Sequence, residues 1–268
     1  MASSTFAASD GDGYEIQMGR WSSILAPRFI EFAGLASASR VLDVGCGTGN
    51  LSFCIARDPS VEAVVGVDFS NTYVDYARGR NRDPRIELHQ GDACALAFAD
   101  ASFDHSLSML VLQFIPKAEL AVREMRRVTR PGGTVAAATW DTRGGFVAYR
   151  LFFDTAAAIE PGAMERRKRM YTRPMSRPGE LAATWKNAGL TDVVQDTVTI
   201  RMNFASFADF WAPNDGKDGP IAEYVGTLPA DVRAKVRDAV EKAYLDGEPD
   251  GPRSYAATAW VVKGKVPG

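Results

Sequence analysis

The sequence has few of the residues that build metal sites, disulfide frameworks or membrane spans. Its 268 residues include three cysteines and two histidines. Cys46, Cys54 and Cys94 match neither a zinc-ligand spacing nor a CxxC redox motif, and a sparse, odd number of cysteines is typical of a reducing compartment. No apolar run approaches the roughly 18 residues that cross a bilayer. We therefore expect a cytoplasmic protein with no metal site and no integral membrane segment.

An excess of charge of one sign is also absent. Lysine and arginine total 31, aspartate and glutamate total 33, and the formal net charge is −2. This balance predicts no general attraction to nucleic acid or to an anionic membrane. We interpret the basic stretch 164–177 as a solvated helix face or lid hinge rather than as a patch for an acidic substrate or nucleic acid. A small-molecule partner is the remaining expectation.

From Arg40 onward, short β-rich runs alternate with helix-patterned runs, which predicts a sheet of parallel strands covered by helices on both faces. We expect strands at 40–44, 61–68, 86–90, 103–110, 134–140, 193–202 and 255–263. Helices are expected at 51–55, 71–80, 117–128, 147–159, 179–187 and 230–245, and Arg130-Pro131-Gly132-Gly133 should separate the third of these from the fifth strand. The pattern indicates an α/β, Rossmann-like fold with seven mostly parallel strands and a helical lid and cap.

The domain organisation follows from where this alternation begins and where it changes. The first residues are small and polar and lack the basic start and apolar centre of a secretory signal, so we expect a disordered leader. Residues 1–33 would form this leader and a lid. Residues 34–268 would form a single domain with cap insertions at about 144–180 and 204–250.

The run Asp43-Val44-Gly45-Cys46-Gly47-Thr48-Gly49 carries the main chemical signal. Glycines at alternate positions after a strand allow a sharp turn and close contact between backbone and ligand. Asp68 ends the next strand, where its carboxylate would accept hydrogen bonds from both hydroxyls of an adenosine ribose. The loop reads GxGxG rather than the dinucleotide pattern GxGxxG, and the acid before it would oppose a diphosphate. The pattern therefore favours a cationic adenosine ligand.

Together with GDACALAFADASFD and the helix leading to RPGG, these motifs resemble the class I S-adenosylmethionine-dependent methyltransferases. The chain is most similar to the small-molecule branch that includes the ubiquinone and menaquinone biosynthesis methyltransferases. The resemblance covers about residues 34–141 and, loosely, 185–202. It implies an enzyme that binds S-adenosyl-L-methionine and releases S-adenosyl-L-homocysteine. Quinone-pathway members carry a different N-terminal segment, so a quinone substrate is not implied.

The resemblance also implies roles for individual residues. The methionine part of the cofactor would lie against the glycine loop and the end of the fourth strand, at Asp43, Gly45, Gly47, Gly49, Met109 and Leu110. Within this set Asp43 would lie near the ammonium group, and the last two would face the sulfonium. The adenosine part would be held by Asp68 on the ribose, Phe69 against the adenine, and Asp92 with the Ala93 backbone at the adenine amino group.

The N-terminal run Tyr14–Trp21 looks like the lid segment of such enzymes. The Tyr14 hydroxyl and the planar Arg20 guanidinium would hold the carboxylate of the cofactor. Gln113, after the fourth strand, either leads a helix or orients the substrate. We interpret the aromatic residues between 204 and 211 as cap core rather than as a ring-stacking site.

Methyl transfer from a sulfonium needs alignment and exclusion of water more than it needs a strong base, so both histidines are expected to be structural. The segment Ser108–Gln113 lacks the Asn-Pro-Pro-aromatic pattern of adenine-amino methyltransferases. We therefore expect methylation of O, N or C on a small molecule. A non-catalytic S-adenosylmethionine-binding module stays open as an alternative. A nicotinamide-dependent oxidoreductase is a weaker one, because Asn50-Leu51 stand where GxGxxG requires glycine.

Overall fold

The structure is a computed structural model that describes residues 4–5, 10–37, 39–215 and 219–268. Parts of the expected leader, residues 1–3 and 6–9, lie outside the described residues, as do residues 216–218 of the second cap range. Among the described helices, none combines the length and the apolar character needed to cross a bilayer.

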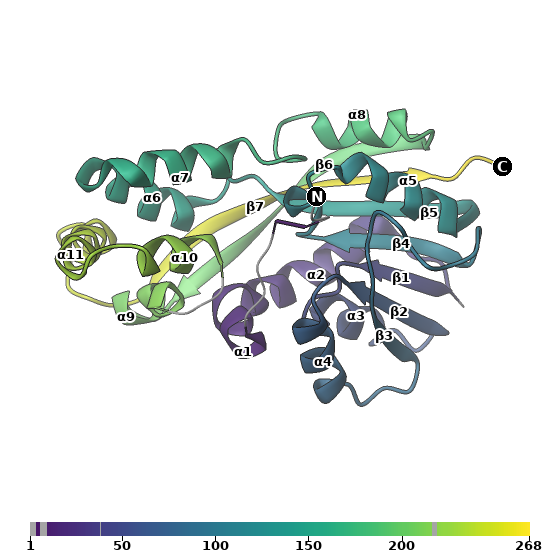
Figure 1. Cartoon of the computed structure of the whole chain (residues 1–268). Coiled ribbons are helices and arrows are strands. Elements are labelled where there is room, and N and C mark those ends of the chain that lie inside the picture. The colour runs from purple at the N-terminus through teal and green to yellow at the C-terminus, as the bar shows by residue number, and fades with distance from the viewer. Residues whose placement is uncertain (1–3, 6–9, 38, 216–218) are drawn as a thin grey trace.

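One seven-stranded sheet forms the centre of the molecule (Figure 1), with the strand order β3-β2-β1-β4-β5-β7-β6. β7 runs antiparallel to both of its neighbours, and the other strand pairs are parallel. The expected mostly parallel, seven-stranded sheet is confirmed. The strands span Arg40–Val44 (β1), Ala63–Asp68 (β2), Ile86–Gln90 (β3), Phe103–Met109 (β4), Thr129–Trp140 (β5), Thr191–Phe204 (β6) and Arg253–Lys265 (β7).

Helices cover both faces of this sheet, because successive strand residues point to opposite sides and both sides are apolar. On β1, Val41 packs into the core on one face and Leu42 into the core on the other. One face carries α2 (Arg20–Ala33), α3 (Asn50–Ile55) and α4 (Asn71–Arg80), and the other carries α5 (Ala118–Val128) and α8 (Glu180–Asn187). The indole of Trp185 on α8 is fully buried and donates a hydrogen bond to the Val135 carbonyl at 2.9 Å.

Five further α-helices gather at one end of the molecule, around the part of β6 and β7 that extends past the other strands (Figure 1). They are α6 (Val147–Ile159), α7 (Pro161–Tyr171), α9 (Phe207–Trp211), α10 (Pro220–Gly226) and α11 (Ala230–Leu245). Phe204, Phe207, Phe210 and Trp211 are all buried there, which confirms their interpretation as core of the cap. The division of the chain into a lid and one domain with two cap insertions stays a prediction.

The expected break at Arg130-Pro131-Gly132-Gly133 was only half right. α5 does end at Val128, but β5 starts at the next residue and runs through these four. The pairing of β5 with β4 shifts register here, and the backbone of Gly132 and Gly133 bonds instead to Val266 at the end of β7. Proline has no N–H to donate, so it is tolerated where strand pairing is interrupted. The segment is an irregular strand start rather than a loop.

The order of the strands determines where a ligand can bind. β1 lies between β2 and β4, so the chain connections after β1 and after β3 leave the sheet in opposite directions. In such sheets a crevice opens beyond the carboxyl ends of the strands at this reversal. The residues that follow β1, β2, β3 and β4 therefore meet at one edge of the sheet.

Candidate active site

A cavity that includes about 760 Å³ of space, part of it open to solvent, lies at this edge. Most of the residues that the sequence predicted to bind the cofactor line it. They are Tyr14, Gly45, Gly47, Asp68, Phe69, Asp92, Ala93, Met109 and Leu110. Residues from the ends of four different strands and from the N-terminal segment are thus brought together in one place.

The glycine loop after β1 folds over the end of β2. The amides of Gly45 and Cys46 both donate to the Val67 carbonyl, at 2.7 and 3.0 Å. Gly45 has a φ of +79°, and a Cβ at this position would lie 2.3 Å from a methyl carbon of Val111. Only glycine combines this left-handed conformation with the close contact. The loop backbone, without side chains, therefore forms one wall of the cavity.

Asp68 is held in a fixed orientation at the end of β2. Its two carboxylate oxygens accept hydrogen bonds from the Gly47 and Ser70 amides, at 2.9 and 2.8 Å. Burial raises the pKa of this carboxyl group above its ordinary value. The next residue, Phe69, leaves 49% of its surface exposed although it is large and apolar, and it lines the same cavity. A carboxylate and an exposed ring are thus presented side by side.

Two of the predicted cofactor-binding residues, Asp43 and Gly49, do not line the cavity. Asp43 is buried, and one of its oxygens accepts a hydrogen bond from the Ser52 hydroxyl at 2.7 Å. Its other oxygen, Oδ1, is buried with no hydrogen-bond partner among the described residues. Burial raises the pKa of Asp43 to about 7. Gly49 precedes α3 in a left-handed conformation and packs against the ring of Phe53.

Arg20 points away from the cavity. Its guanidinium pairs with Asp209 on α9 at 2.8 Å and stacks over the ring of Trp21, with 4.2 Å between Cζ and the ring centroid. It therefore joins the N-terminal segment to the cap. The role of Arg20 as a ligand of the cofactor carboxylate stays a prediction, whereas its expected companion Tyr14 does line the cavity.

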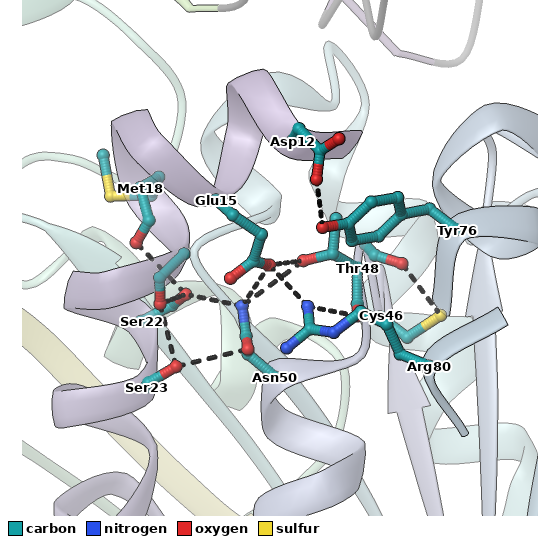
Figure 2. A network of polar contacts seen from close by, with 12 residues as sticks. Asp12, Glu15, Met18, Ser22, Ser23, Cys46, Thr48, Asn50, Tyr76 and Arg80 are labelled. Carbon is teal, nitrogen blue, oxygen red and sulfur yellow. Dashed lines mark hydrogen bonds and ion pairs between the residues drawn. The ribbon is translucent and has the colours of Figure 1, made fainter. Parts of the chain in front are cut away.

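The N-terminal segment is docked on the glycine loop by a carboxylate that sequence reasoning missed. Glu15 lies in a π-helical turn (Glu15–Gly19) between α1 (Gly11–Tyr14) and α2. Figure 2 shows its Oε1 accepting from the Thr48 hydroxyl and, at 2.9 Å each, from the Asn50 amide and the Arg80 guanidinium. Glu15 belongs to the run read as a lid, but no spacing in the sequence connects it with Arg80.

Two further contacts hold the same segment across the cavity. The Tyr76 hydroxyl on α4 donates to Asp12 at 2.7 Å (Figure 2), and the Thr5 amide donates to the Phe114 carbonyl at 2.9 Å. Ser4 and Tyr14, which lie near the two ends of this stretch, line the cavity. The described part of residues 4–19 thus forms a strap over the site.

A second cavity, of about 440 Å³, adjoins the first and shares Tyr14, Leu110 and Phe114 with it. Leu110 has a φ of +65°, a strained conformation for a leucine, and such strain is concentrated at functional sites. Gln113 lines the second cavity only. Its amide nitrogen donates to the Leu110 carbonyl at 3.0 Å, and its Oε1 is buried with no partner among the described residues. Gln113, in the segment after β4, thus lines the second cavity rather than the first.

Neither histidine lines either cavity. His105 accepts a hydrogen bond from the Ala36 amide at 3.1 Å, and burial lowers its pKa to about 4. His89 is half exposed near Glu87. The described residues contain no group of three or more histidine, cysteine, aspartate or glutamate side chains arranged to hold a metal ion. The site therefore consists of backbone amides, carboxylates and aromatic rings.

Comparison with known proteins shows which proteins part of this chain is similar to. A family model described as a methyltransferase domain matches residues 42–137, which confirms the resemblance expected from the motifs over that segment. The malonyl-[acyl-carrier protein] O-methyltransferase of Erwinia pyrifoliae is 43% identical over 112 residues, covering 42% of this chain and 41% of the relative. A demethylmenaquinone methyltransferase of Beutenbergia cavernae is 40% identical over 113 residues, covering 42% and 45%.

The likeness to solved structures extends over nearly the whole chain. Phosphoethanolamine N-methyltransferase 2 of Haemonchus contortus, solved with phosphomonomethylethanolamine and S-adenosylhomocysteine, superposes with a TM-score of 0.60 at 16% identity. The match covers 96% of this chain and 57% of that one. At this identity the comparison shows a shared Rossmann-like fold. The matched part of the chain spans less than half the length of either of these two curated relatives.

Proposed function

We propose that this chain is a methyltransferase that uses S-adenosyl-L-methionine to methylate a small-molecule acceptor. The observation that carries the proposal is the pair of adjoining cavities at the reversal point of the sheet. The first is lined by nine of the twelve residues that the methyltransferase resemblance assigned to the cofactor, and the second opens beside the same strand end. A cofactor and an acceptor would thus meet at their common wall.

The residues of the first cavity fit an adenosine. The Asp68 carboxylate is already oriented by the Gly47 and Ser70 amides, and its remaining lone pairs would accept from the ribose hydroxyls. The exposed ring of Phe69 would pack on the adenine, and Asp92 would accept from the adenine amino group. The open backbone at Gly45 and Gly47 would allow the chain to contact the methionine part directly.

The charge under the loop fits a cation. Asp43 has a buried oxygen without a hydrogen bond, and a buried carboxylate without a partner is unfavourable. An ammonium group at the glycine loop would relieve this cost. A diphosphate at the same place would increase it, which supports an amino-acid cofactor over a dinucleotide.

The bound sulfonium supplies a strong leaving group, so the protein has mainly to align the acceptor and exclude water. The side chains of Tyr14, Leu110 and Phe114 form the wall where the two cavities adjoin. The strained backbone of Leu110 is bonded on both sides, through its amide to the Ala138 carbonyl and through its carbonyl to Gln113. This fixes the wall against which an acceptor atom would be positioned.

Calorimetric titration with S-adenosylmethionine, S-adenosylhomocysteine and NAD tests the proposal. We expect saturable binding of the first two and none of NAD. Asp68→Ala should weaken the binding of S-adenosylhomocysteine by about 1 to 3 kcal/mol, because a hydrogen bond to a charged group is lost. Asp75→Ala, which removes an exposed carboxylate on α4, is the matched control and should leave affinity unchanged.

Three results would contradict the proposal. Saturable binding of NAD without binding of S-adenosylhomocysteine would point to an oxidoreductase. Full affinity in Asp68→Ala would show that the ribose is bound elsewhere. Binding of S-adenosylhomocysteine without release of it from S-adenosylmethionine, across phenols, amines, carboxylates and quinols, would leave only a cofactor-binding module.

A further inference from the structure

The second cavity contains a cation, Arg173, that no carboxylate of the described residues contacts; Glu223 raises its pKa only from a distance and is itself paired with Arg166. Arg173 follows α7 and lies over the ring of Phe114, with 4.5 Å between its Cζ and the ring centroid. Within the described part of the chain, its guanidinium forms no hydrogen bond and no ion pair. Two other arginines of the same basic stretch are paired, Arg167 with Asp154 at 2.6 Å and Arg166 with Glu223 at 3.0 Å. Of the basic residues in this stretch, Arg166 and Arg167 thus have carboxylate partners, and Arg173 is the one among the described residues that lines the second cavity.

The surroundings make this lack of a partner costly. The cavity around the guanidinium is lined mainly by buried apolar side chains, among them Met18, Trp140, Phe146 and Met170. Burial lowers the pKa of Arg173 below its usual range, although the group stays charged at neutral pH. A cation in such surroundings is normally paired or hydrogen-bonded. An anionic ligand would supply what the protein leaves out.

The shape of the lining favours a planar ligand. Tyr149 is stacked on Phe146 with 4.1 Å between ring centroids and 28° between planes, and Trp140 lies 5.1 Å from Phe146. The indole Nε1 of Trp140 and the Oε1 of Gln113 are buried without a hydrogen-bond partner among the described residues. One donor and one acceptor are therefore free to orient a ring that packs between aromatic walls.

We propose that the second cavity binds the methyl acceptor as an aromatic carboxylate, with its carboxylate on Arg173 and its ring against Trp140 and Phe146. A single guanidinium matches one carboxylate in charge and in its two parallel hydrogen bonds. A phosphate dianion would be only half neutralised, because Arg173 is the one cationic side chain among the described residues that line this cavity. That this ligand is the methyl acceptor rests on the function proposed above. That it is an aromatic carboxylate rests on Arg173 and its surroundings alone.

Matched acid and amide pairs test the proposal in the presence of saturating S-adenosylhomocysteine. The pairs are 4-hydroxybenzoate and 4-hydroxybenzamide, 4-hydroxycinnamate and its amide, and indole-3-acetate and its amide. In the unmodified protein we expect calorimetry to show at least one acid binding about tenfold more tightly than its amide. Arg173→Gln should reduce this preference to less than about twofold, because the charge-assisted pair is lost.

Arg169→Gln is the control, since it removes an exposed arginine of the same stretch and should keep the full preference. Arg173→Lys keeps the charge but not the planar fork, and should retain part of the preference. Thermal melts guard against misfolding. Because Arg173 forms no hydrogen bond or ion pair among the described residues, Arg173→Gln loses only the contact with the Phe114 ring. It should therefore melt close to the parent temperature and bind S-adenosylhomocysteine equally well.

Three results would overturn the proposal. They are equal binding of acids and amides, an acid preference that survives in Arg173→Gln, and no binding of any of the six compounds at millimolar concentration. Failure of the methyltransferase proposal is recognised separately. In that case acids would bind in an Arg173-dependent way, but no methyl group would be transferred to them.

Discussion

The two adjoining cavities are built in different ways. The first takes its walls from strand ends and from a loop backbone, at positions a fixed distance after each strand. The second shares the segment after β4 with the first, but takes most of its walls from side chains of the lid, β5, α6 and the region of α7 and the segment after it. A site of the first kind leaves a local spacing in the sequence. A site of the second kind is formed only when distant elements pack, so its residues carry no common motif.

Substituting glycine by alanine in the glycine loop and on the exposed surface of α4 should change stability in opposite directions. Gly45→Ala forces a left-handed alanine and a Cβ against Val111, which should cost about 2 to 5 kcal/mol of stability. Binding of S-adenosylhomocysteine should be lost. Gly79→Ala lies on α4 with open space around it, and should stabilise the protein by up to about 1 kcal/mol. Denaturant unfolding of both variants checks this, and full ligand affinity in Gly45→Ala would contradict it.

Asp43→Asn should make stability less dependent on pH. Burial raises the pKa of Asp43 from its ordinary value of 3.8 to about 7, so the folded protein keeps this proton up to about pH 7. Between these values the unfolded chain binds fewer protons, so the stability contributed by this group falls as pH rises through the window. The cost at pH 8 reaches about 4 kcal/mol at most.

The variant should therefore melt higher than the parent at pH 8 and similarly at pH 4, while binding the cofactor more weakly. Melting curves across this range test the expectation. Asp75→Asn, at an exposed position, should follow the parent throughout. Parallel pH profiles for Asp43→Asn and the parent would show that the buried carboxyl has no such cost.

Glu15→Gln should loosen the strap without unfolding the sheet. The Glu15 carboxylate binds three donors on the glycine loop and α4, but it is partly exposed, so the loss should be about 1 kcal/mol. Hydrogen exchange should become faster in residues 10–19 and stay unchanged in β1 and β4. Glu62→Gln, at an exposed position, is the control. Unchanged exchange in the strap would mean that its docking depends on other contacts.

Arg20→Gln should have the smallest effect on cofactor affinity, less than about threefold, because the guanidinium pairs with Asp209 rather than facing the cavity. Asp209→Asn removes the same ion pair and should lower the stability of the protein by up to about 1 kcal/mol. The opposite result is equally informative. A tenfold loss of affinity in Arg20→Gln alone would show that Arg20 turns to the cofactor when it binds.

Much of the fold was predictable because its elements carry strong local signals. The bounds of β1, α4, β3, α6 and α11 agree with the sequence expectations to the residue. The start of β5 was not predictable, since proline and two glycines normally end regular structure. Here the backbone bonds of Gly132 and Gly133 to Val266, just past β7, and the ion pair of Arg130 with Asp104 hold this segment in the sheet. β6 and β7 were predicted too short for the same reason, because each extends by pairing with the other.

The residues of the site also fall into those with a local signal in the sequence and those whose surroundings depend on distant contacts. Asp68 and Gly45 were placed from their positions after strands, and both lie where the spacing predicted. The orientation of Arg20 depended on Asp209, which is 189 residues away, and no pattern links the two. Arg173 was one arginine among several in a basic stretch. Only the folded arrangement shows that Arg166 and Arg167 have carboxylate partners and that Arg173 instead lines the second cavity.

The strap, which is the described part of residues 4–19, should set the timing of ligand exchange. It is tied to Phe114 on one side of the first cavity and to Tyr76, Thr48 and Arg80 on the other. A ligand as large as an adenosylated amino acid must wait for these bonds to open, both to enter and to leave. We therefore expect association to level off at a ceiling set by the opening rate as ligand concentration rises. Turnover would then be governed by how often the strap lifts, and not by the chemical step.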